Sequence, residues 1–269
     1  MTKAFRKNDL LIIKLGGSII TNKREKFKAK IKQINKICKV ISELNKRMIL
    51  VHGGGSFAHP IAKKYQLNLG YKSRDQLIGY SETKIKLIEL SEIILKALKR
   101  SNLPSILFLP SSFIIAKNGR IFKIDLEPLK MLLDLSIVPL LSGDIVPDYE
   151  KGFSIVSGDQ IATELALKLK AEKVIFGCDV DGIFTKDPKK NKNAEIIPII
   201  KPSMFKEIVK MISKSSCIDV THGMLGKLKE GIRLAKNGIE AVILNLNNPN
   251  NLKRFIEGKK VLCSRILPD

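Results

Sequence analysis

The chain has 269 residues, of which 44% are hydrophobic and 18 are glycine. This length and composition fit a compact globular protein with a sizeable core, and they exclude a disordered, solenoid or low-complexity chain. The formal net charge of +22 is extreme, and residues 1–50 alone hold 14 Lys and Arg against 3 Asp and Glu. We expect so positive a protein to favour anionic ligands.

The most basic segment, at 28–46, raises nucleic-acid binding as an alternative. Its apolar residues nevertheless recur at helical spacing: Ile31, Ile34, Ile37, Val40, Ile41 and Leu44. That spacing favours a helix with a solvated, lysine-rich outer face. We therefore do not expect nucleic acid to be a partner.

The four cysteines (Cys38, Cys178, Cys217 and Cys263) are scattered and form no C-x-x-C pair. This usage indicates reduced thiols in a cytoplasmic protein without a structural zinc. The apolar run near the start is interrupted by Lys14, and no cleavage site follows it, so we predict a buried first strand rather than a signal peptide. No apolar stretch reaches the length of a membrane span.

Continuous apolar runs alternate with helical patterns along the whole chain. We predict strands buried on both faces at 10–15, 48–52, 106–109, 137–141, 173–177 and 240–245. We predict helices at 28–46, 75–100, 127–135, 159–170 and 223–237. This alternation predicts an α/β fold, a three-layer αβα sandwich around a mostly parallel central sheet.

Two turn-bounded segments interrupt the alternation. Residues 113–124, around Asn118-Gly119, and 145–156, around Lys151-Gly152, have the pattern of β-hairpins that decorate the sheet. No linker rich in Pro or Gly divides the chain. We expect a single domain over 1–269, with a soft division into 1–168 and 169–269.

Glycine-rich turns follow or precede several of the predicted elements. They read KLGGS (14–18), HGGGS (52–56), SGD (142–144), SGD (157–159) and THGMLGK (221–227). In an open α/β sheet, ligands bind beyond the carboxyl ends of the strands, where glycines let backbone N–H groups approach phosphate oxygens. The set therefore predicts a phosphate-binding edge.

Lys14 and His59 are the most informative single residues near these turns. Lys14 interrupts an apolar strand, and a buried lysine without an anion would be costly, so we favour a phosphate ligand over a lysine that extends to solvent. His59 follows the triple glycine of VHGGGSFAH (51–59). Its imidazole can donate a hydrogen bond to an acceptor phosphate.

The order of the motifs resembles the amino acid kinase superfamily and, within it, the isopentenyl phosphate kinases. The matching strings are IIKLGGSIIT (12–21), VHGGGSFAH (51–59), LLSGDIV (140–146), IVSGDQIA (155–162), GCDVDGIF (177–184) and DVTHGMLGK (219–227). The resemblance implies an ATP-dependent kinase that converts isopentenyl phosphate to isopentenyl diphosphate. It also implies that 1–168 is the phosphate-acceptor lobe and 169–269 the nucleotide-binding lobe.

The resemblance assigns roles to residues at the matching positions. It implies catalytic roles for Lys14, Lys23, His59, Asp159 and Lys227. It implies ATP binding by Lys14, Gly16, Gly17, Ser18, Gly55, Asp179, Asp181, Gly223 and Lys227. For the acceptor it implies Gly54, His59 and Gly158, to which we add Tyr80, Ile85 and Ile88 of the 75–100 helix as candidate walls of an alkyl pocket.

ATP chemistry implies Mg²⁺ bridging the phosphates, without a protein-held metal site. The resemblance also implies a homodimer across a continued sheet. Two residues depart from the family pattern, Ala58 and His222, where the family tends to have glycine. The alternatives are a kinase for another small phosphate or phosphonate such as fosfomycin, and a basic nucleic-acid-binding protein on the same fold.

Overall fold

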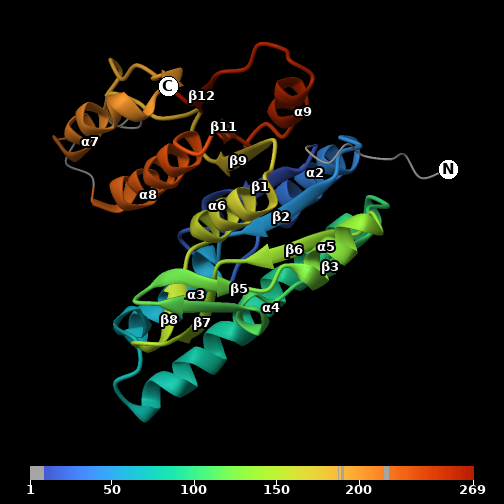
Figure 1. The fold of residues 1–269 in the computed structure, drawn as a ribbon, viewed down its shortest axis with the longest axis vertical. Helices are drawn as coiled ribbons and strands as arrows, with labels where there is room; N and C mark the ends of the chain where they lie inside the picture. The colour runs from blue at the N-terminus through green and yellow to red at the C-terminus, as the bar shows by residue number, and fades with distance from the viewer. Residues whose placement is uncertain (1–8, 187, 189–190, 215–217) are drawn as a thin grey trace.

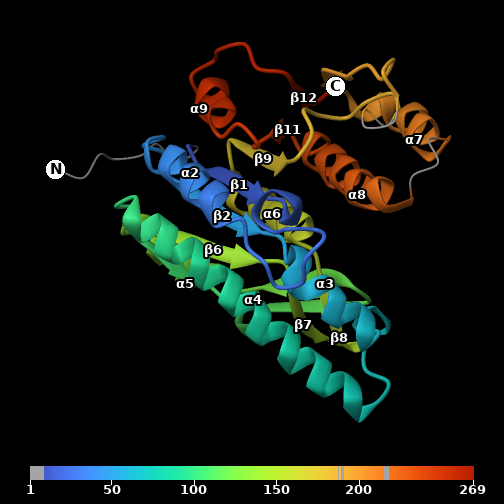
Figure 2. The same cartoon turned by 180° about the vertical axis from the view of Figure 1, so that it is seen from behind.

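The structure of the protein is a computed structural model that describes residues 9–186, 188, 191–214 and 218–269. Of residues 212–214 and 218–222 it describes only the backbone. Figure 1 shows the fold and Figure 2 the same molecule from behind.

Within the described residues, eight strands form the main sheet in the order β10-β12-β11-β9-β1-β2-β6-β3. All neighbouring strands are parallel except β11 and β12. This confirms the mostly parallel sheet. The strand bounds are β1 Leu11–Leu15, β2 Met48–His52, β3 Ser105–Leu107, β6 Val138–Ser142, β9 Lys173–Cys178, β10 Ile199–Ile200, β11 Glu240–Asn245 and β12 Cys263–Ile266.

Helices cover both faces of this sheet, which confirms the three-layer architecture. One face packs against α5 (Glu127–Asp134), α6 (Gly158–Leu169) and α8 (Ile218–Ala235), as Figure 1 shows. The other packs against α2 (Ile31–Ser42), α4 (Arg74–Arg100) and α9 (Asn250–Ile256), with α2 and α4 in front in Figure 2. Because β1, β2, β9 and β11 contribute side chains to both apolar clusters, they are buried on both faces.

The two predicted hairpins are present and join into a second, smaller sheet. It contains β4 (Ile114–Lys117), β5 (Arg120–Ile124), β7 (Asp144–Asp148) and β8 (Gly152–Val156), in the order β5-β4-β7-β8. The hairpins join where β4 runs parallel to β7, with Ala116 paired with Asp148. In Figure 1 the small sheet lies below the main sheet, beside α4.

Several predictions about individual elements were wrong in detail. The segment predicted as a doubly buried strand at 106–109 is the short edge strand β3, in which Ile106 is exposed, because nothing in the described chain pairs with its outer side. The basic helix is shorter than predicted, at 31–42. The structure also contains elements that were not predicted: α1 (Gly17–Ile20), α3 (Gly55–Lys64), α7 (Phe205–Lys214), α9, β10 and β12.

Helix α3 was missed because its sequence contains a glycine start and Pro60. Proline lacks the N–H that would bond to the carbonyl of Ser56, four residues earlier. In the structure that carbonyl accepts a hydrogen bond from the N–H of Phe27 at 3.3 Å. The helix therefore continues through Pro60, and His59 lies on a helix rather than in a loop.

No helix in the described part of the chain is long and apolar enough to cross a membrane. Cys38, Cys178 and Cys263 are buried free thiols, and Cys217 lies outside the described residues. The main sheet is continuous across the division at 168–169 through the pairing of β1 with β9. The single domain and its soft division stay predictions.

Candidate active site

Four of the five predicted glycine turns, at 14–18, 52–56, 142–144 and 157–159, pack against one another near the carboxyl ends of β1, β2 and β6. A Cβ atom on Gly17 would lie 2.6 Å from Cα of Gly55, and one on Gly143 would lie 2.8 Å from the nitrogen of Gly158. Such contacts are too close for any side chain. Glycine is therefore needed here for loop-to-loop packing, before any phosphate contact is considered.

Two helices begin at this edge. Gly55, the first residue of α3, has φ of +48°, which disfavours other residues. Helix α6 begins at Gly158 and is capped by Ser157, whose hydroxyl accepts the N–H of Gln160 at 3.1 Å. Free N–H groups and the helix dipole make such N-termini suitable for anions. Because Ser157 supplies the cap, the carboxylate of Asp159 is available for another role.

Asp159 holds two lysines that come from distant parts of the chain. Lys14 Nζ of β1 lies 2.7 Å from Oδ1 of Asp159, and Lys227 Nζ of α8 lies 3.1 Å from Oδ2. All three residues are buried. The structure thus brings together three of the five predicted catalytic residues in one cluster, which we call the triad.

One carboxylate cannot neutralise two ammonium groups, and the pKa values reflect this. Burial would raise the pKa of Asp159, but Lys14 and Lys227 outweigh it and lower that pKa to about 2. Burial lowers the pKa of Lys14 and the charge of Lys227 lowers it further, against the opposing effect of Asp159. The charged form of Lys14 is therefore destabilised in the protein alone, and an anion such as a phosphate group bound beside it would stabilise that charge.

His59 lies in the second turn of α3, the helix that begins at this edge. Its ring is solvent-accessible, yet partial desolvation and then the charge of Lys14 lower its pKa below the ordinary value. The effect of Lys14 on the pKa values of both His59 and Asp159 indicates that the histidine lies near the triad. The lowered pKa favours the neutral imidazole, which can still donate one hydrogen bond.

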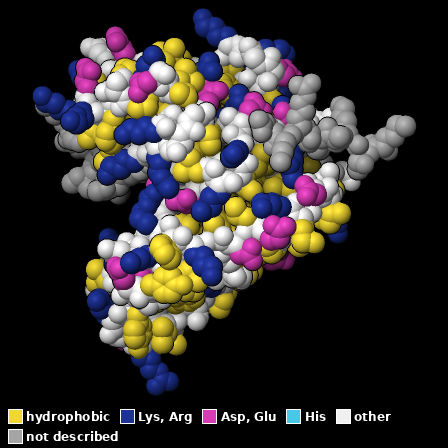
Figure 3. All heavy atoms as spheres, viewed as in Figure 1, with side chains coloured by type: hydrophobic (Ala, Val, Ile, Leu, Met, Phe, Trp, Pro, Cys, Tyr) yellow, Lys and Arg dark blue, Asp and Glu magenta, His cyan; other side chains and the backbone are white. Residues whose placement is uncertain are grey.

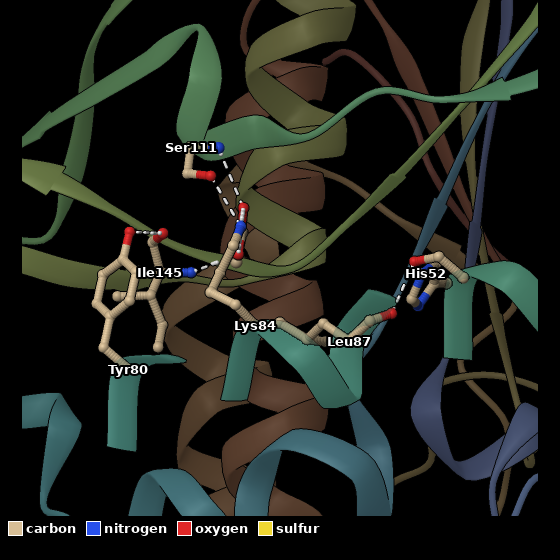
Figure 4. Close-up of polar contacts among 8 residues, drawn as sticks. His52, Tyr80, Lys84, Leu87, Ser111 and Ile145 are labelled. Atoms are coloured by element: carbon tan, nitrogen blue, oxygen red, sulfur yellow. Dashed lines mark hydrogen bonds and ion pairs between the residues drawn. The ribbon is translucent and has the colours of Figure 1, made fainter. Parts of the chain in front are cut away.

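His52 is a second histidine in the same motif, with a different environment. It is fully buried at the end of β2, and its Nε2 lies 2.8 Å from Oγ of Ser91 on α4, which donates to the carbonyl of Leu87 (Figure 4). Burial lowers its pKa to about 4. His52 therefore joins β2 to α4 and does not face the open edge.

A polar group on the other side of the edge contains three predicted ATP-binding or catalytic residues. Ser18 donates to Oδ1 of Asp179 at 2.9 Å, and Lys23 Nζ lies 3.4 Å from Oδ2 of the same carboxylate. Asp181, nearby in sequence, accepts a hydrogen bond from Asn245 at 3.0 Å. Lys23 has an exposed side chain that pairs with Asp179 and not with Asp159 of the triad.

The remaining predicted glycines have different settings. Gly16 donates its N–H to the carbonyl of Gly177 at 2.8 Å. A Cβ atom added to Gly54 would lie 2.5 Å from the Cβ of Ala58.

The prediction that 221–227 is a turn opening a helix was wrong. Helix α8 begins at Ile218, so Gly223 and Lys227 lie inside it, and Lys227 Nζ lies 3.4 Å from the carbonyl of Gly223.

Of the two departures, Ala58 lies within α3 and not at a positive φ, so its methyl group is tolerated by the backbone. The side chain of His222 lies outside the described residues.

Helix α4 does not present all three predicted pocket residues to the interior. Tyr80 packs with Phe153 and donates its hydroxyl to the carbonyl of Ile145 at 3.0 Å. Ile85 and Ile88 are 57% and 40% exposed, on the outer side of the helix away from its buried stripe of Thr83 and Leu87. We therefore withdraw Ile85 and Ile88 as pocket walls and retain Tyr80 as a candidate.

A second lysine–aspartate pair, which joins α4 to the start of β7, was not predicted from the sequence. Lys84 Nζ lies 2.7 and 2.6 Å from the two oxygens of Asp144 and 2.8 Å from Oγ of Ser111 (Figure 4). Asp144 also accepts the N–H groups of Ser111 and Ile145. A carboxylate in the apolar run VPLLSGDIVP could have signalled the need for a buried cation.

The described residues contain no group of three or more His, Cys, Asp or Glu side chains arranged to hold a metal ion. Figure 3 shows the surface indented between the part that contains α8 and the small sheet, with Lys and Arg side chains beside the indentation. The site is thus cationic, rich in backbone donors and open on one side.

A sequence model of the amino acid kinase family matches residues 9–245. Among similar proteins, the isopentenyl phosphate kinase of Methanothermobacter thermautotrophicus is 34% identical over 267 residues, covering 96% of this chain and 98% of the relative. That of Methanocaldococcus jannaschii is 34% identical, covering 93% and 96%.

Solved structures give the same result. A crystal structure of isopentenyl phosphate kinase superposes with a TM-score of 0.83 at 32% identity, covering 96% of this chain and 99% of that one. The product complex of the Thermoplasma acidophilum isopentenyl phosphate kinase superposes with a TM-score of 0.75 at 28% identity, covering 96% and 99%.

Proposed function

Because the chain belongs to the amino acid kinase family, we propose that it is an ATP-dependent kinase that phosphorylates isopentenyl phosphate to isopentenyl diphosphate. Relatives that match nearly the whole chain carry this activity in their names, which favours isopentenyl phosphate over fosfomycin and over nucleic acid. One observation carries the proposal: Lys14 and Lys227, from distant parts of the chain, meet on the buried carboxylate of Asp159 beside the packed glycine loops.

The reaction joins two polyanions, so charge neutralisation and alignment are the main tasks of the protein. An oxygen of isopentenyl phosphate attacks the γ-phosphorus of ATP. A new O–P bond forms, the bond to the β–γ bridging oxygen breaks, and ADP leaves with that electron pair. The attacking oxygen is already ionised near neutral pH, so no side chain has to remove a proton.

In this mechanism Lys14 and Lys227 bind the transferring phosphoryl group, and Asp159 fixes both ammonium groups in place. His59 donates a hydrogen bond to the acceptor phosphate, next to Gly54 and Gly158. Gly16, Gly17, Ser18, Gly55 and Gly223 border the nucleotide phosphates. Lys23, Asp179 and Asp181 lie on the nucleotide side.

The proposal includes Mg²⁺ bound mainly by the nucleotide phosphates. Both oxygens of Asp159 are already engaged by lysines, so the triad does not offer a carboxylate to the ion. When bound, the ion would supply charge neutralisation on the phosphates. The buried free thiols fit a reducing compartment such as the cytoplasm. A homodimer is part of the same proposal.

A coupled ADP-release assay tests the function. We expect turnover that depends on isopentenyl phosphate, with weaker activity on dimethylallyl and geranyl phosphates and none on acetylglutamate. Preference for fosfomycin would identify the rival kinase. An absence of turnover, together with salt-sensitive RNA binding, would reject the enzyme assignment.

A further inference from the structure

The tip of the β4–β5 hairpin contacts both helices that carry the triad. Gln160, which follows Asp159 in α6, accepts the N–H of Ile121 at 3.1 Å and donates to the carbonyl of Gly119 at 3.3 Å. Arg120, between them, reaches α8 instead, where its Nη1 lies 2.7 Å from Oε1 of Glu230. We call residues 119–121 the strap, since they contact α6 and α8 at once.

The strap is anchored by hydrogen bonds to one buried carboxylate, that of Asp148 at the end of β7. Burial alone would raise its pKa, but hydrogen bonds donated to it, led by that from Gly119, lower the pKa well below the ordinary range. The donors are the N–H groups of Asn118, Gly119, Glu150 and Lys151 at 2.8–3.1 Å and the hydroxyl of Ser154 at 2.7 Å. One carboxylate therefore joins the turns of both hairpins.

Glu230 lies three residues after Lys227 in α8, and its side chain is only 9% exposed. Arg120 is its close partner, because Arg233 Nη1 is 3.8 Å away and lies closer, at 2.7 Å, to Glu164 of α6. A carboxylate this buried is costly without a cation. Arg120 thus determines how firmly this turn of α8 is held to the small sheet.

We propose that Arg120 is a positioning residue, which acts through Glu230 to hold α8 so that Lys227 stays on Asp159, aligned for the phosphoryl group. The strap joins the small sheet, on the acceptor side, to the helix that supplies a nucleotide-side lysine. This inference rests on the proposed function for its turnover readout, whereas its nucleotide-binding readout does not depend on which acceptor is used.

The test is a double-mutant cycle of Arg120→Gln and Glu230→Gln. We expect Arg120→Gln to lower kcat about tenfold, because a small misplacement of a catalytic lysine is costly. ATP affinity, measured by calorimetry without acceptor, should weaken about threefold, while KM for isopentenyl phosphate changes less than about twofold. In the Glu230→Gln background, the same Arg120 substitution should have little further effect on kcat.

Arg265→Gln is the matched control. Arg265 Nε lies 2.6 Å from Oε1 of Glu240, with side chains 45% and 15% exposed, against 52% and 9% for Arg120 and Glu230. This pair lies where β11 begins, away from the carboxyl edge. We expect the control to leave kcat and ATP affinity unchanged.

Each outcome supports or overturns the proposal. Unchanged kcat and ATP affinity in Arg120→Gln, even with reduced thermal stability, would make the pair merely structural. Additive effects of the two substitutions would show that Arg120 does not act through Glu230. If the wild-type protein fails to turn over isopentenyl phosphate, the proposed function fails, but ATP affinity still decides whether the strap positions α8.

Discussion

Two lysine–aspartate pairs with buried carboxylates differ in how their charge is balanced. Lys84 has Asp144 to itself and contacts both carboxylate oxygens as well as Ser111. Lys14 shares Asp159 with Lys227, one lysine on each oxygen. The first pair matches one lysine with one carboxylate, whereas in the second two lysines share one carboxylate, so an anion bound beside Lys14 would stabilise its charged form.

A lysine paired with a buried carboxylate therefore does not by itself mark a phosphate site. Lys84 and Tyr80, one turn apart on α4, bond to the consecutive residues Asp144 and Ile145 of β7. That pair of contacts fastens a helix to a sheet. The unbalanced charge of the triad, next to glycine loops and helix N-termini, is what suits it to phosphoryl transfer.

The largest expected effect is on catalysis by the triad. Lys14→Met and Lys227→Met each remove one positive charge and keep the stem volume. We expect kcat to fall at least about 10²-fold, which is at least about 2.7 kcal/mol of transition-state stabilisation. Circular dichroism should show an intact fold, and near-normal kcat in both variants would contradict the assignment.

Lys84→Met should give the opposite pattern. It leaves the carboxylate of Asp144 buried without its cation, although the N–H groups of Ser111 and Ile145 still donate to it. We expect a loss of about 2–3 kcal/mol in the free energy of unfolding, measured in urea, with kcat of the folded fraction within about threefold of wild type. If kcat of Lys84→Met falls as far as that of Lys14→Met, the claim that only the triad acts in catalysis is wrong.

His59→Ala should lower kcat/KM for isopentenyl phosphate by about 10- to 50-fold and leave ATP affinity near wild type, because a hydrogen bond to a charged group is lost. His59→Gln keeps a donor and should retain more activity. Since desolvation lowers the pKa of His59, any decline in kcat/KM that reports its deprotonation should begin as pH rises through a value below the ordinary 6.5.

The acceptor phosphate titrates in a similar range, so the comparison between wild type and His59→Gln is the diagnostic one. If both His59 variants match wild type, His59 has no role in acceptor binding.

The smallest effect is expected at Ile85. Its side chain faces solvent, so Ile85→Ala should change the free energy of unfolding by less than about 0.5 kcal/mol. The ratio of activity on geranyl and isopentenyl phosphates should stay constant. A shift of that ratio towards the longer substrate would restore Ile85 to the pocket wall.

The sequence predicted the elements whose signals are local and strong. The doubly buried strands, the two hairpins and the glycine loops all follow from apolar runs and turn residues, and Lys14 was conspicuous because it interrupts such a run. The resemblance to known kinases supplied Asp159 and Lys227, which are 68 residues apart and meet only in the fold.

The rest depends on contacts that no local pattern encodes. Helix α3 persists through Pro60 because Phe27, far away in sequence, satisfies the freed carbonyl. Lys84 is one of many lysines on amphipathic helices, so only its partner Asp144 distinguishes it. The exposed side of α4 carries isoleucines, and the helical pattern alone could not tell which of them face inward.

The most direct test compares kcat of Lys14→Met and Lys84→Met in one ADP-release assay. The assay contains no urea and is run at a temperature at which both variants are folded. The account predicts that kcat of Lys14→Met lies at least about 30-fold below that of Lys84→Met, since only Lys14 has charge left for the phosphoryl group. Equal kcat values, or a lower value for Lys84→Met, would contradict it.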